Sequence, residues 1–427
     1  MEYSKLSKNK LESIHNDLLA RYERYKSMGL SLDMSRGKPG DEQLSLSKGL
    51  ITCLSEDEYI SGNIDCRNYG GIDGIPAMKK IFADLLNISP EQVVVGGNSS
   101  LAMMFDSIAV NMTHGPGESE PWFRQGKGEV KFLCPVPGYD RHFSICEYFG
   151  IQMIPVPMNS DGPDMDLIER LARLDSMIKG IWCVPLYSNP GGAIYSDETI
   201  RRFAALSPAA VDFRIYWDDA YHLHHLYANP AKTLNIIDEC EKAGNPNMPY
   251  VFASFSKISF SGAAVACVAS SVSNVEYIKK RLSYQTIGPD KINQLRHVKF
   301  FRDANGVIAQ MKEHAKILAP KFELIHKILE RELLPLGIAK WSRPLGGYFI
   351  SFDAPPHTAE RIVALCGAVG LTLTPAGAAY PYRKDPLDSN IRIAPSYPTL
   401  LELEEALDVF CVCVKIAAIE ILFASLV

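Results

Sequence analysis

The sequence predicts an α/β protein in which a large domain, built on a mainly parallel seven-stranded sheet, is joined to a smaller α+β domain. Apolar, β-rich runs alternate with helical patterns from about residue 92 to 270, which is typical of strands joined by crossover helices. After residue 290 this alternation gives way to long helical stretches. With 427 residues, of which 47% are hydrophobic, the chain is long enough for two domains with well-formed cores.

Seven runs are predicted to form the sheet, and helix-like stretches separate most of them. They are Gln92–Val95, Val130–Cys134, Ile151–Val156, Ile178–Val184, Arg214–Trp217, Tyr250–Ala253 and Ala264–Ser270. Ligands of such sheets bind at the carboxyl ends of the strands. Functional residues are therefore expected in the segments that follow these runs.

The helical region after residue 290 is predicted to bridge the two domains. It begins with Ile292–Arg302 and continues over about Gly306–Leu334, where Pro320 predicts a kink. Beyond it lie two strand candidates and two helix candidates: Gly347–Phe352, Ile391–Ala394, Ala359–Val369 and Thr399–Ala418. We predict an N-terminal arm that joins the small domain over residues 1–50, a large domain over 51–305, and a small domain with the bridging helix over 306–427.

Composition argues against several classes of protein. The net charge is 44 − 49 = −5 and no basic run occurs, so nucleic acid is not an expected partner. The ten cysteines form no Cys-x-x-Cys motif and no paired spacing, which predicts neither a disulfide framework nor a zinc site and suits a reducing compartment. No signal core and no apolar run of about 18 residues occurs, so we expect a cytoplasmic protein without a membrane partner.

Lys257 carries the clearest chemical signal. It follows the strand Tyr250–Ala253 in the run Ser254-Phe255-Ser256-Lys257. An amine at the end of a strand, partly screened from water, has a lowered pKa and can form a Schiff base with a carbonyl. Taken alone, a solvated surface lysine is the more common interpretation.

Two further strand ends suggest an anion site and a cation site. Val95 is followed by Gly-Gly-Asn and then Ser99 and Ser100 at a helix start, which suits a phosphate, although Ser99 could equally be a simple N-cap. The strand that ends at Asp218 places a carboxylate where a protonated pyridine nitrogen could pair with it, and a cap for the next segment is the alternative. Asn189, in Asn-Pro-Gly-Gly, could bond a ring hydroxyl or merely form a turn.

The order Asn-Pro-Gly-Gly, Asp-Asp-Ala-Tyr, Ser-Phe-Ser-Lys resembles the class I/II aminotransferases, which are pyridoxal-phosphate enzymes of fold type I. More narrowly, the runs at 35–39, 137–143 and 286–291 resemble a bacterial aspartate aminotransferase subgroup related to the MocR aminotransferase domain. The resemblance implies pyridoxal 5'-phosphate as cofactor and transamination of aspartate with 2-oxoglutarate. A transaminase for alanine or aromatic amino acids, a pyridoxal-phosphate lyase, and a catalytically silent cofactor-binding regulator stay open as alternatives.

The resemblance also implies roles for residues around the cofactor ring. Lys257 would form the Schiff base and carry the proton between the substrate Cα and the cofactor. Asp218 would pair with the ring nitrogen, Tyr221 and Asn189 would bond the ring oxygen, and Tyr139 would stack on the ring.

The phosphate and the substrate have their own implied partners. Phosphate would be bound by Ser99, Ser100 and Ser254, with Tyr69 reaching over from a second subunit of a homodimer that shares its active sites. Arg392 would bind the substrate α-carboxylate as a bidentate pair, with the backbone of Gly37 opposite.

Two points are left open by the sequence. Most of the family has a phosphate-binding arginine where this chain has Ala264, and Ser256, Ser261 or backbone N–H groups are possible substitutes. A dicarboxylate substrate needs a second cation, for which the candidates are Arg36, Lys38, Arg141, Arg281 and Lys291.

The three histidines at 222, 224 and 225 suggest a zinc site at first sight. No metal is expected, because no cysteine or carboxylate lies at a spacing typical of zinc ligands.

Overall fold

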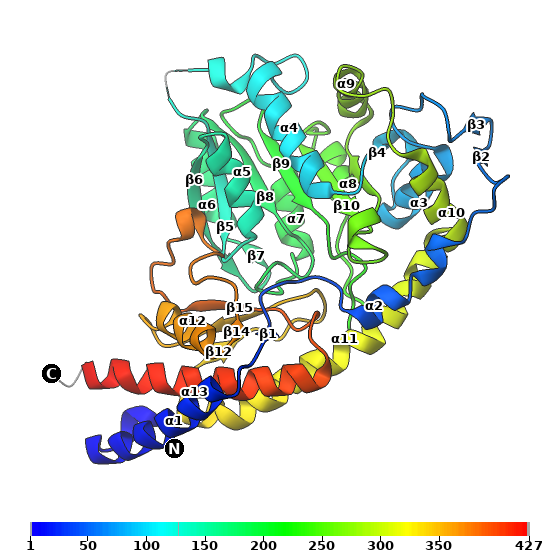
Figure 1. Ribbon diagram of the computed structural model, residues 1–427. Helices are drawn as coiled ribbons and strands as arrows, with labels where there is room; N and C mark the ends of the chain where they lie inside the picture. Colours follow the sequence, from blue (N-terminus) through cyan, green and yellow to red (C-terminus); the bar gives the residue numbers. More distant parts are fainter. Residues whose placement is uncertain (1, 127, 425–427) are drawn as a thin grey trace.

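The computed structural model describes residues 2–126 and 128–424 (Figure 1). Its centre is an eight-stranded sheet that contains all seven predicted strands and one short extra strand, β7, at an edge. The order is β4 (Val93–Val95), β11 (Ala266–Ala269), β10 (Pro249–Ser254), β9 (Arg214–Asp218), β8 (Ile178–Cys183), β5 (Lys131–Val136), β6 (Gln152–Asn159) and β7 (Gly162–Pro163). Only β11 and β7 run antiparallel to their neighbours, so the predicted mainly parallel sheet is confirmed.

The central strands are buried at every position because helices cover both faces of the sheet. Every residue of β8, β9 and β10 is buried, which explains why these runs are mostly apolar rather than alternating. One face packs against α3 (Pro76–Leu86), α6 (Met165–Leu174), α7 (Asp197–Ala204), α8 (Ile236–Lys242) and α10 (Lys291–Phe301). The other packs against α4 (Ser100–His114), α5 (Asp140–Tyr148) and α9 (Val272–Leu282).

The long helix α11 (Ala304–Glu332) connects the large sheet to the second part of the molecule (Figure 1). The Asp303 carboxylate caps its start by accepting a bond from the Gly306 N–H at 2.9 Å. The helix continues through Pro320. Val307 and Met311 pack into the core beneath the large sheet, whereas Leu318 to Leu329 pack into the second core.

The smaller part is α+β, as predicted. Its antiparallel sheet contains β12 (Lys340–Trp341), β13 (Ile350–Asp353) and β15 (Asn390–Ile393), and its helices are α12 (Ala359–Ala368) and α13 (Leu400–Ala424). The N-terminal helix α1 (Lys8–Ser27) packs on α13, and β1 (Leu32–Asp33) pairs with β14 (Leu371–Thr372). The N-terminal segment then runs past the large sheet to α2 (Asp41–Ser45).

The remaining elements are short. They are the hairpin β2 (Ile60–Ser61) and β3 (Ile64–Asp65), and the 3-10 helices η1 (Tyr3–Lys5), η2 (Lys48–Ile51), η3 (Pro90–Gln92), η4 (Trp122–Arg124), η5 (Ser261–Ala263), η6 (Leu334–Leu336) and η7 (Pro381–Arg383). Within the described ranges, no helix is long and apolar enough to cross a membrane.

Candidate active site

Lys257 lies three residues beyond the end of β10, where the parallel strands of the large sheet terminate together. Its side chain is half-buried, and its Nζ lies 5.0 Å from the centroid of the Tyr221 ring. Burial lowers the pKa of this amine, the charge of Asp218 opposes that effect, and the charge of Arg392 adds to it. The amine has no hydrogen bond or ion pair to the residues that the structure describes, so it is available to a ligand.

Asp218 ends β9 with a carboxylate that is only half satisfied. Its Oδ2 lies 3.0 Å from Nε2 of His142, whereas its Oδ1 is buried and has no hydrogen-bond partner among the residues that the structure describes. The residue is 3% exposed, so water does not screen its charge. The carboxylate accepts no bond from the following backbone, which makes the alternative interpretation as a cap wrong.

His142 is a site residue that the sequence analysis missed. It lies on α5, is 2% exposed, and stacks on Trp182 at 4.4 Å with an interplanar angle of 7°. The stacking fixes the imidazole plane so that Nε2 points at Asp218. The only local signal was a histidine on the buried face of a helix that follows the Pro-Gly-Tyr motif, and 76 residues separate it from its carboxylate partner.

Two phenols flank this carboxylate. Tyr221 is 4% exposed, and the Tyr139 ring meets the His142 imidazole edge-on at 4.9 Å. Burial, and then the neighbouring negative charges, raise the pKa of both phenols, so both are neutral hydrogen-bond donors near neutral pH. The structure thus brings Tyr139 and Tyr221 to Asp218, with the Tyr221 ring beside the Lys257 amine.

Arg392, on β15 of the smaller sheet, reaches across to the large sheet. Its NH1 donates to Asp140 Oδ1 at 2.8 Å and to Asn189 Oδ1 at 3.3 Å, and its NH2 donates to Thr374 Oγ1 at 3.4 Å. Its guanidinium lies 4.7 Å from the centroid of the Phe349 ring, and its Nε is buried with no hydrogen-bond partner in the described part of the chain. A guanidinium with donor capacity to spare can bind a carboxylate.

Gly37, in the N-terminal segment, lies against the Phe349 ring. A Cβ atom added to Gly37 would come within 2.2 Å of Cζ of Phe349, the ring on which Arg392 lies. Only glycine permits so close an approach of backbone to ring. The Ser35 carbonyl is also fixed nearby, because it accepts a bond from Thr374 Oγ1 at 2.9 Å.

The anion site that the sequence predicts at Ser99 and Ser100 lies at the N-terminus of α4, and the alternative interpretation of Ser99 as an N-cap is correct. Ser99 is the N-cap, with its Oγ accepting a bond from Ala102 N at 3.2 Å. Ser254 donates to Ser256, and Ser256 to the Asn98 carbonyl, at 3.1 and 3.3 Å. These hydroxyls gather beside the first N–H groups of a 15-residue helix, which is an arrangement that favours phosphate.

Ala264 does not present a side chain to this cradle. It is 1% exposed and packs in the core, and its carbonyl accepts a bond from Asn293 Nδ2 at 2.9 Å. Two serines lie beside the turn at Asn98: Ser256 donates to the Asn98 carbonyl, and Ser261 donates to the Ser256 carbonyl at 2.7 Å.

Tyr69 is not brought to the site of its own chain. Its side chain is 82% exposed. It lies next to Gly70, whose carbonyl accepts a bond from Lys291 Nζ at 2.8 Å and approaches Gly288 closely. The segment that carries Tyr69 and the run at 286–291 therefore lie side by side on one surface, together with the exposed Ile287.

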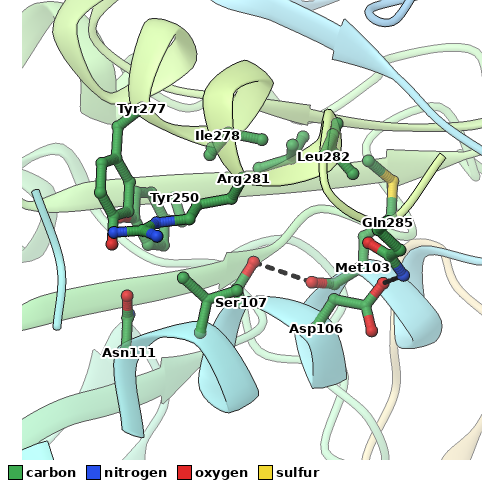
Figure 2. A pocket seen from close by; sticks show the side chains of 12 residues that line it. Met103, Asp106, Ser107, Asn111, Tyr250, Tyr277, Ile278, Arg281, Leu282 and Gln285 are labelled. Carbon is green, nitrogen blue, oxygen red and sulfur yellow. Dashed lines mark hydrogen bonds between the residues drawn. The ribbon is translucent and has the colours of Figure 1, made fainter. Parts of the chain in front are cut away.

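Three of the five candidates for a second substrate-binding cation are committed elsewhere. Figure 2 shows Arg281 on α9 in a cavity of about 80 Å³ between α4 and α9, where its guanidinium lies 4.9 Å from the Tyr277 ring. Lys291 is bonded to Gly70, and Lys38 Nζ lies 3.7 Å above the Tyr397 ring.

The other two candidates, Arg36 and Arg141, are exposed. Arg141 follows Asp140 at the start of α5, and its charge lowers the pKa of Tyr139, which places it within electrostatic reach of that phenol. Arg36 precedes Gly37 in the N-terminal segment. Both residues therefore remain candidates beside the Arg392 site.

The three histidines after Tyr221 do not converge. His222 Nδ1 bonds the Asp219 carbonyl at 3.0 Å, His225 Nδ1 bonds the Tyr187 hydroxyl at 2.7 Å, and His224 packs edge-on against the Tyr348 ring. In the part of the chain that the structure describes, no three His, Cys, Asp or Glu side chains are grouped to hold a metal ion.

A strand-end amine, a half-satisfied carboxylate and a carboxylate-binding arginine on this fold define a fold-type I pyridoxal-phosphate-dependent transferase. Comparison with known proteins supports that class. The family model "Aspartate amino-transferase" matches residues 6–425. A protein of Mycolicibacterium smegmatis is 47% identical over 429 residues, which cover 100% of both chains.

The aspartate aminotransferase of Corynebacterium glutamicum is 44% identical over 408 residues, covering 95% of this chain and 94% of that protein. The crystal structure of an aspartate transaminase from the same species matches with a TM-score of 0.95 and 43% identity, over 98% of this chain and 99% of that one. The chain therefore belongs to the aspartate aminotransferase family. Its members, and enzymes of this fold class, depend on pyridoxal phosphate.

Proposed function

We propose that this chain is an aspartate aminotransferase that uses pyridoxal 5'-phosphate bound through Lys257 and transfers the amino group of aspartate to 2-oxoglutarate. The observation that carries the proposal is the free, buried Oδ1 of Asp218 beside an amine of lowered pKa. A buried carboxylate oxygen without a donor calls for a cationic partner, and a protonated pyridine nitrogen is one. The name of the relative from Corynebacterium glutamicum supports aspartate as substrate.

The residues present fit this cofactor. Asp218, held by His142, would pair with the ring nitrogen, and the neutral Tyr221 phenol and the Asn189 amide are donors for the ring oxygen. Tyr139 would lie against the ring. When bound, the cofactor supplies an electron sink for the electron pair released at the substrate Cα.

The cofactor phosphate fits the cradle at the start of α4. Ser99, Ser100 and Ser254 are proposed to hold it together with the free N–H groups of the helix. Ser256 is added to this set because it bridges Ser254 and the Asn98 turn. These groups would take the place of the phosphate-binding arginine that most of the family has at the position of Ala264.

Lys257 is proposed to move the proton. Only the neutral amine can accept the proton from the substrate Cα, and burial of the side chain favours that neutral form. The positive charge of Arg392 acts in the same direction. The same amine, once protonated, would give the proton to the carbon of the cofactor that lies next to the substrate nitrogen.

Arg392 is proposed to hold the α-carboxylate of the substrate. It lies between Asn189 on the large-sheet side and Thr374 on the small-sheet side, so it fixes the substrate where the two parts of the molecule meet. Asp140 occupies part of the guanidinium at 2.8 Å. An incoming carboxylate must therefore share the guanidinium with Asp140 or displace that side chain.

We also propose a homodimer in which Tyr69 completes the phosphate site of the partner subunit. The supporting observation is that Tyr69, 82% exposed, lies on the same surface as the 62% exposed Ile287, where a partner subunit could reach both. Arg36 and Arg141 are the proposed cations for the side-chain carboxylate of aspartate.

The test is the absorption spectrum of the purified protein before and after addition of aspartate, alanine or phenylalanine, with Lys257→Ala alongside. We expect a yellow protein whose visible band is lost with aspartate much faster than with the other two amino acids. If the band is lost faster with alanine or phenylalanine, that amino acid and not aspartate is the preferred substrate. A stable yellow protein that no amino acid converts would indicate a silent cofactor-binding protein, and a colourless protein that takes up no cofactor would contradict the proposal entirely.

A further inference from the structure

Gln43 lies at the centre of a buried hydrogen-bond network that ends on residues 255–260, the loop that carries Lys257 and is called the lysine loop below. The residue is 0% exposed and belongs to α2, directly after the segment that carries Gly37. Its amide nitrogen donates to the Tyr348 hydroxyl at 2.7 Å and to Nδ1 of His314 at 2.9 Å. Its amide oxygen accepts the Gly40 N–H at 3.3 Å.

Both side chains that receive these bonds contact main-chain oxygens beside the reactive amine. The Tyr348 hydroxyl donates to the carbonyl of Lys257 at 3.3 Å. His314 Nε2 donates to the carbonyl of Ile258 at 3.1 Å. One amide thus reaches two consecutive peptide groups of the lysine loop, each through a single intervening side chain.

The chemistry of the groups allows one arrangement of protons. The Gly40 N–H can only donate, so the amide oxygen of Gln43 must face it. Both amide protons then point at Tyr348 and His314, which makes Nδ1 of His314 an acceptor and leaves its proton on Nε2. Burial lowers the pKa of His314 to about 4, so the imidazole keeps this neutral form near neutral pH.

The network joins the two ends of the proposed active site. At one end are the carbonyls of Lys257 and Ile258. At the other end is Gly40, three residues after Gly37. Gly37 packs on the Phe349 ring, and Arg392 lies against the same ring. Because every donor and acceptor of the amide is used, the network is rigid, and rigid support is what a reacting group needs.

We propose that Gln43 is a positioning residue for Lys257. Acting through Tyr348 and His314, it holds the peptide groups of Lys257 and Ile258 in one orientation and so aims the amine at the substrate. The inference rests on the proposed role of Lys257 in transamination. Gln43 itself does not touch the reacting atoms.

The first test compares Gln43→Met with a matched control, Gln294→Met. Gln294 is equally buried, and its amide oxygen also accepts a backbone N–H, that of Ile75 at 2.9 Å. In the holoenzyme, we expect Gln43→Met to lower kcat by about 10-fold or more while KM for aspartate stays within about 2-fold. It should also shift the pH midpoint of the visible absorption band, and Gln294→Met should do neither.

A double-mutant cycle with Tyr348→Phe tests the route of the effect. Tyr348→Phe keeps the ring and removes only the hydroxyl that bonds the Lys257 carbonyl. If Gln43 acts through that hydroxyl, the double variant is slower than the slower single variant by no more than about 2-fold. Tyr348→Phe also provides the kcat and absorption measurements should Gln43→Met fail to fold.

Additive losses in the cycle, a change in KM alone, or equal effects of the two glutamine substitutions would overturn the inference. So would an unchanged absorption midpoint in both Gln43→Met and Tyr348→Phe. If the wild-type enzyme transaminates normally and the Gln43 and Tyr348 variants are as active as wild type, the inference fails but the proposed function stands. A wild-type protein that binds no pyridoxal phosphate overturns both.

Discussion

A buried carboxylate with one oxygen bonded and the other free costs free energy unless a cation completes it. Asp218 is such a group, and its position beside the Lys257 amine explains how a single side chain can direct the chemistry of the site. His142 holds one oxygen, so the other is fixed in direction and not only in distance. Arg392 is the proposed cation for the α-carboxylate of the substrate.

Asp218→Asn is expected to lower kcat by about 100-fold or more, because an amide cannot stabilise the positive charge on a ring nitrogen. Asp219→Asn is the matched control, since the neighbouring carboxylate forms no hydrogen bond to the described residues. Steady-state assays of both holoenzymes with aspartate measure the two kcat values. Equal losses in the two variants would mean that Asp218 is not specific in this role.

Arg392→Lys should raise KM for aspartate by about 100-fold, because an ammonium cannot make the bidentate pair that a guanidinium makes with a carboxylate. Arg361→Lys is the control, because Arg361 makes a comparable two-bond pair with Glu420 at the surface. We expect that variant to keep its KM. An unchanged KM in Arg392→Lys would assign the carboxylate to another residue.

At the scale of elements, two helices are tied to the lysine loop by neutral histidines. His297 of α10 bonds Ser259 at 2.9 Å, and His314 of α11 bonds Ile258 at 3.1 Å. Burial lowers the pKa of each imidazole to about 4 in the folded protein. The loop that carries Lys257 is thus fixed from two sides by groups that must stay neutral.

The stability of the fold should consequently fall between pH 6.5 and about 4. A histidine whose folded pKa is depressed stabilises the fold above its unfolded pKa, near 6.5, and this contribution is lost as pH falls toward the folded value. For His297 the loss by pH 4.5 is on the order of 2 kcal/mol. Urea unfolding of wild type and His297→Asn at pH 7 and pH 4.5 measures it, and an equal loss in both proteins would refute the assignment.

At the scale of the whole molecule, the proposed dimer depends on the surface that carries Tyr69 and Ile287. Ile287 is 62% exposed, and a charge there should block association through an apolar contact. We predict that Ile287→Glu is monomeric and inactive, whereas Leu401→Glu, at an 81% exposed position on α13, stays dimeric and active. Sedimentation velocity with parallel assays tests this, and an active monomer would rule out a shared site.

Much of this architecture could be predicted because its signals are local. The central parallel strands are mostly apolar runs, and the site residues lie at or shortly after their ends: Asp218 is the last residue of β9, Lys257 lies three residues after β10, and Asn189 lies six residues after β8. The partners of these residues could not be predicted in the same way. His142 lies 76 residues from Asp218, and Asp140 lies 252 residues from Arg392, so only tertiary packing brings them together.

Gln43 is a further example, because its partner His314 lies 271 residues away and no local pattern distinguishes it from an ordinary helix residue. The phosphate site stays a prediction. Ser256 was already a candidate for it from the sequence, but its bond to the Asn98 carbonyl, 158 residues away, could not be predicted. The domain boundaries at residues 50 and 305 and the individual site roles stay predictions.

The central claim is that Lys257 is the residue that binds pyridoxal phosphate. Borohydride reduction of the purified holoenzyme, followed by proteolysis and mass spectrometry, tests it directly. The account predicts a single phosphopyridoxyl group on the peptide that contains Lys257, and none on the same peptide of Lys257→Ala. A label on another lysine, or no label on a yellow protein, would contradict the account.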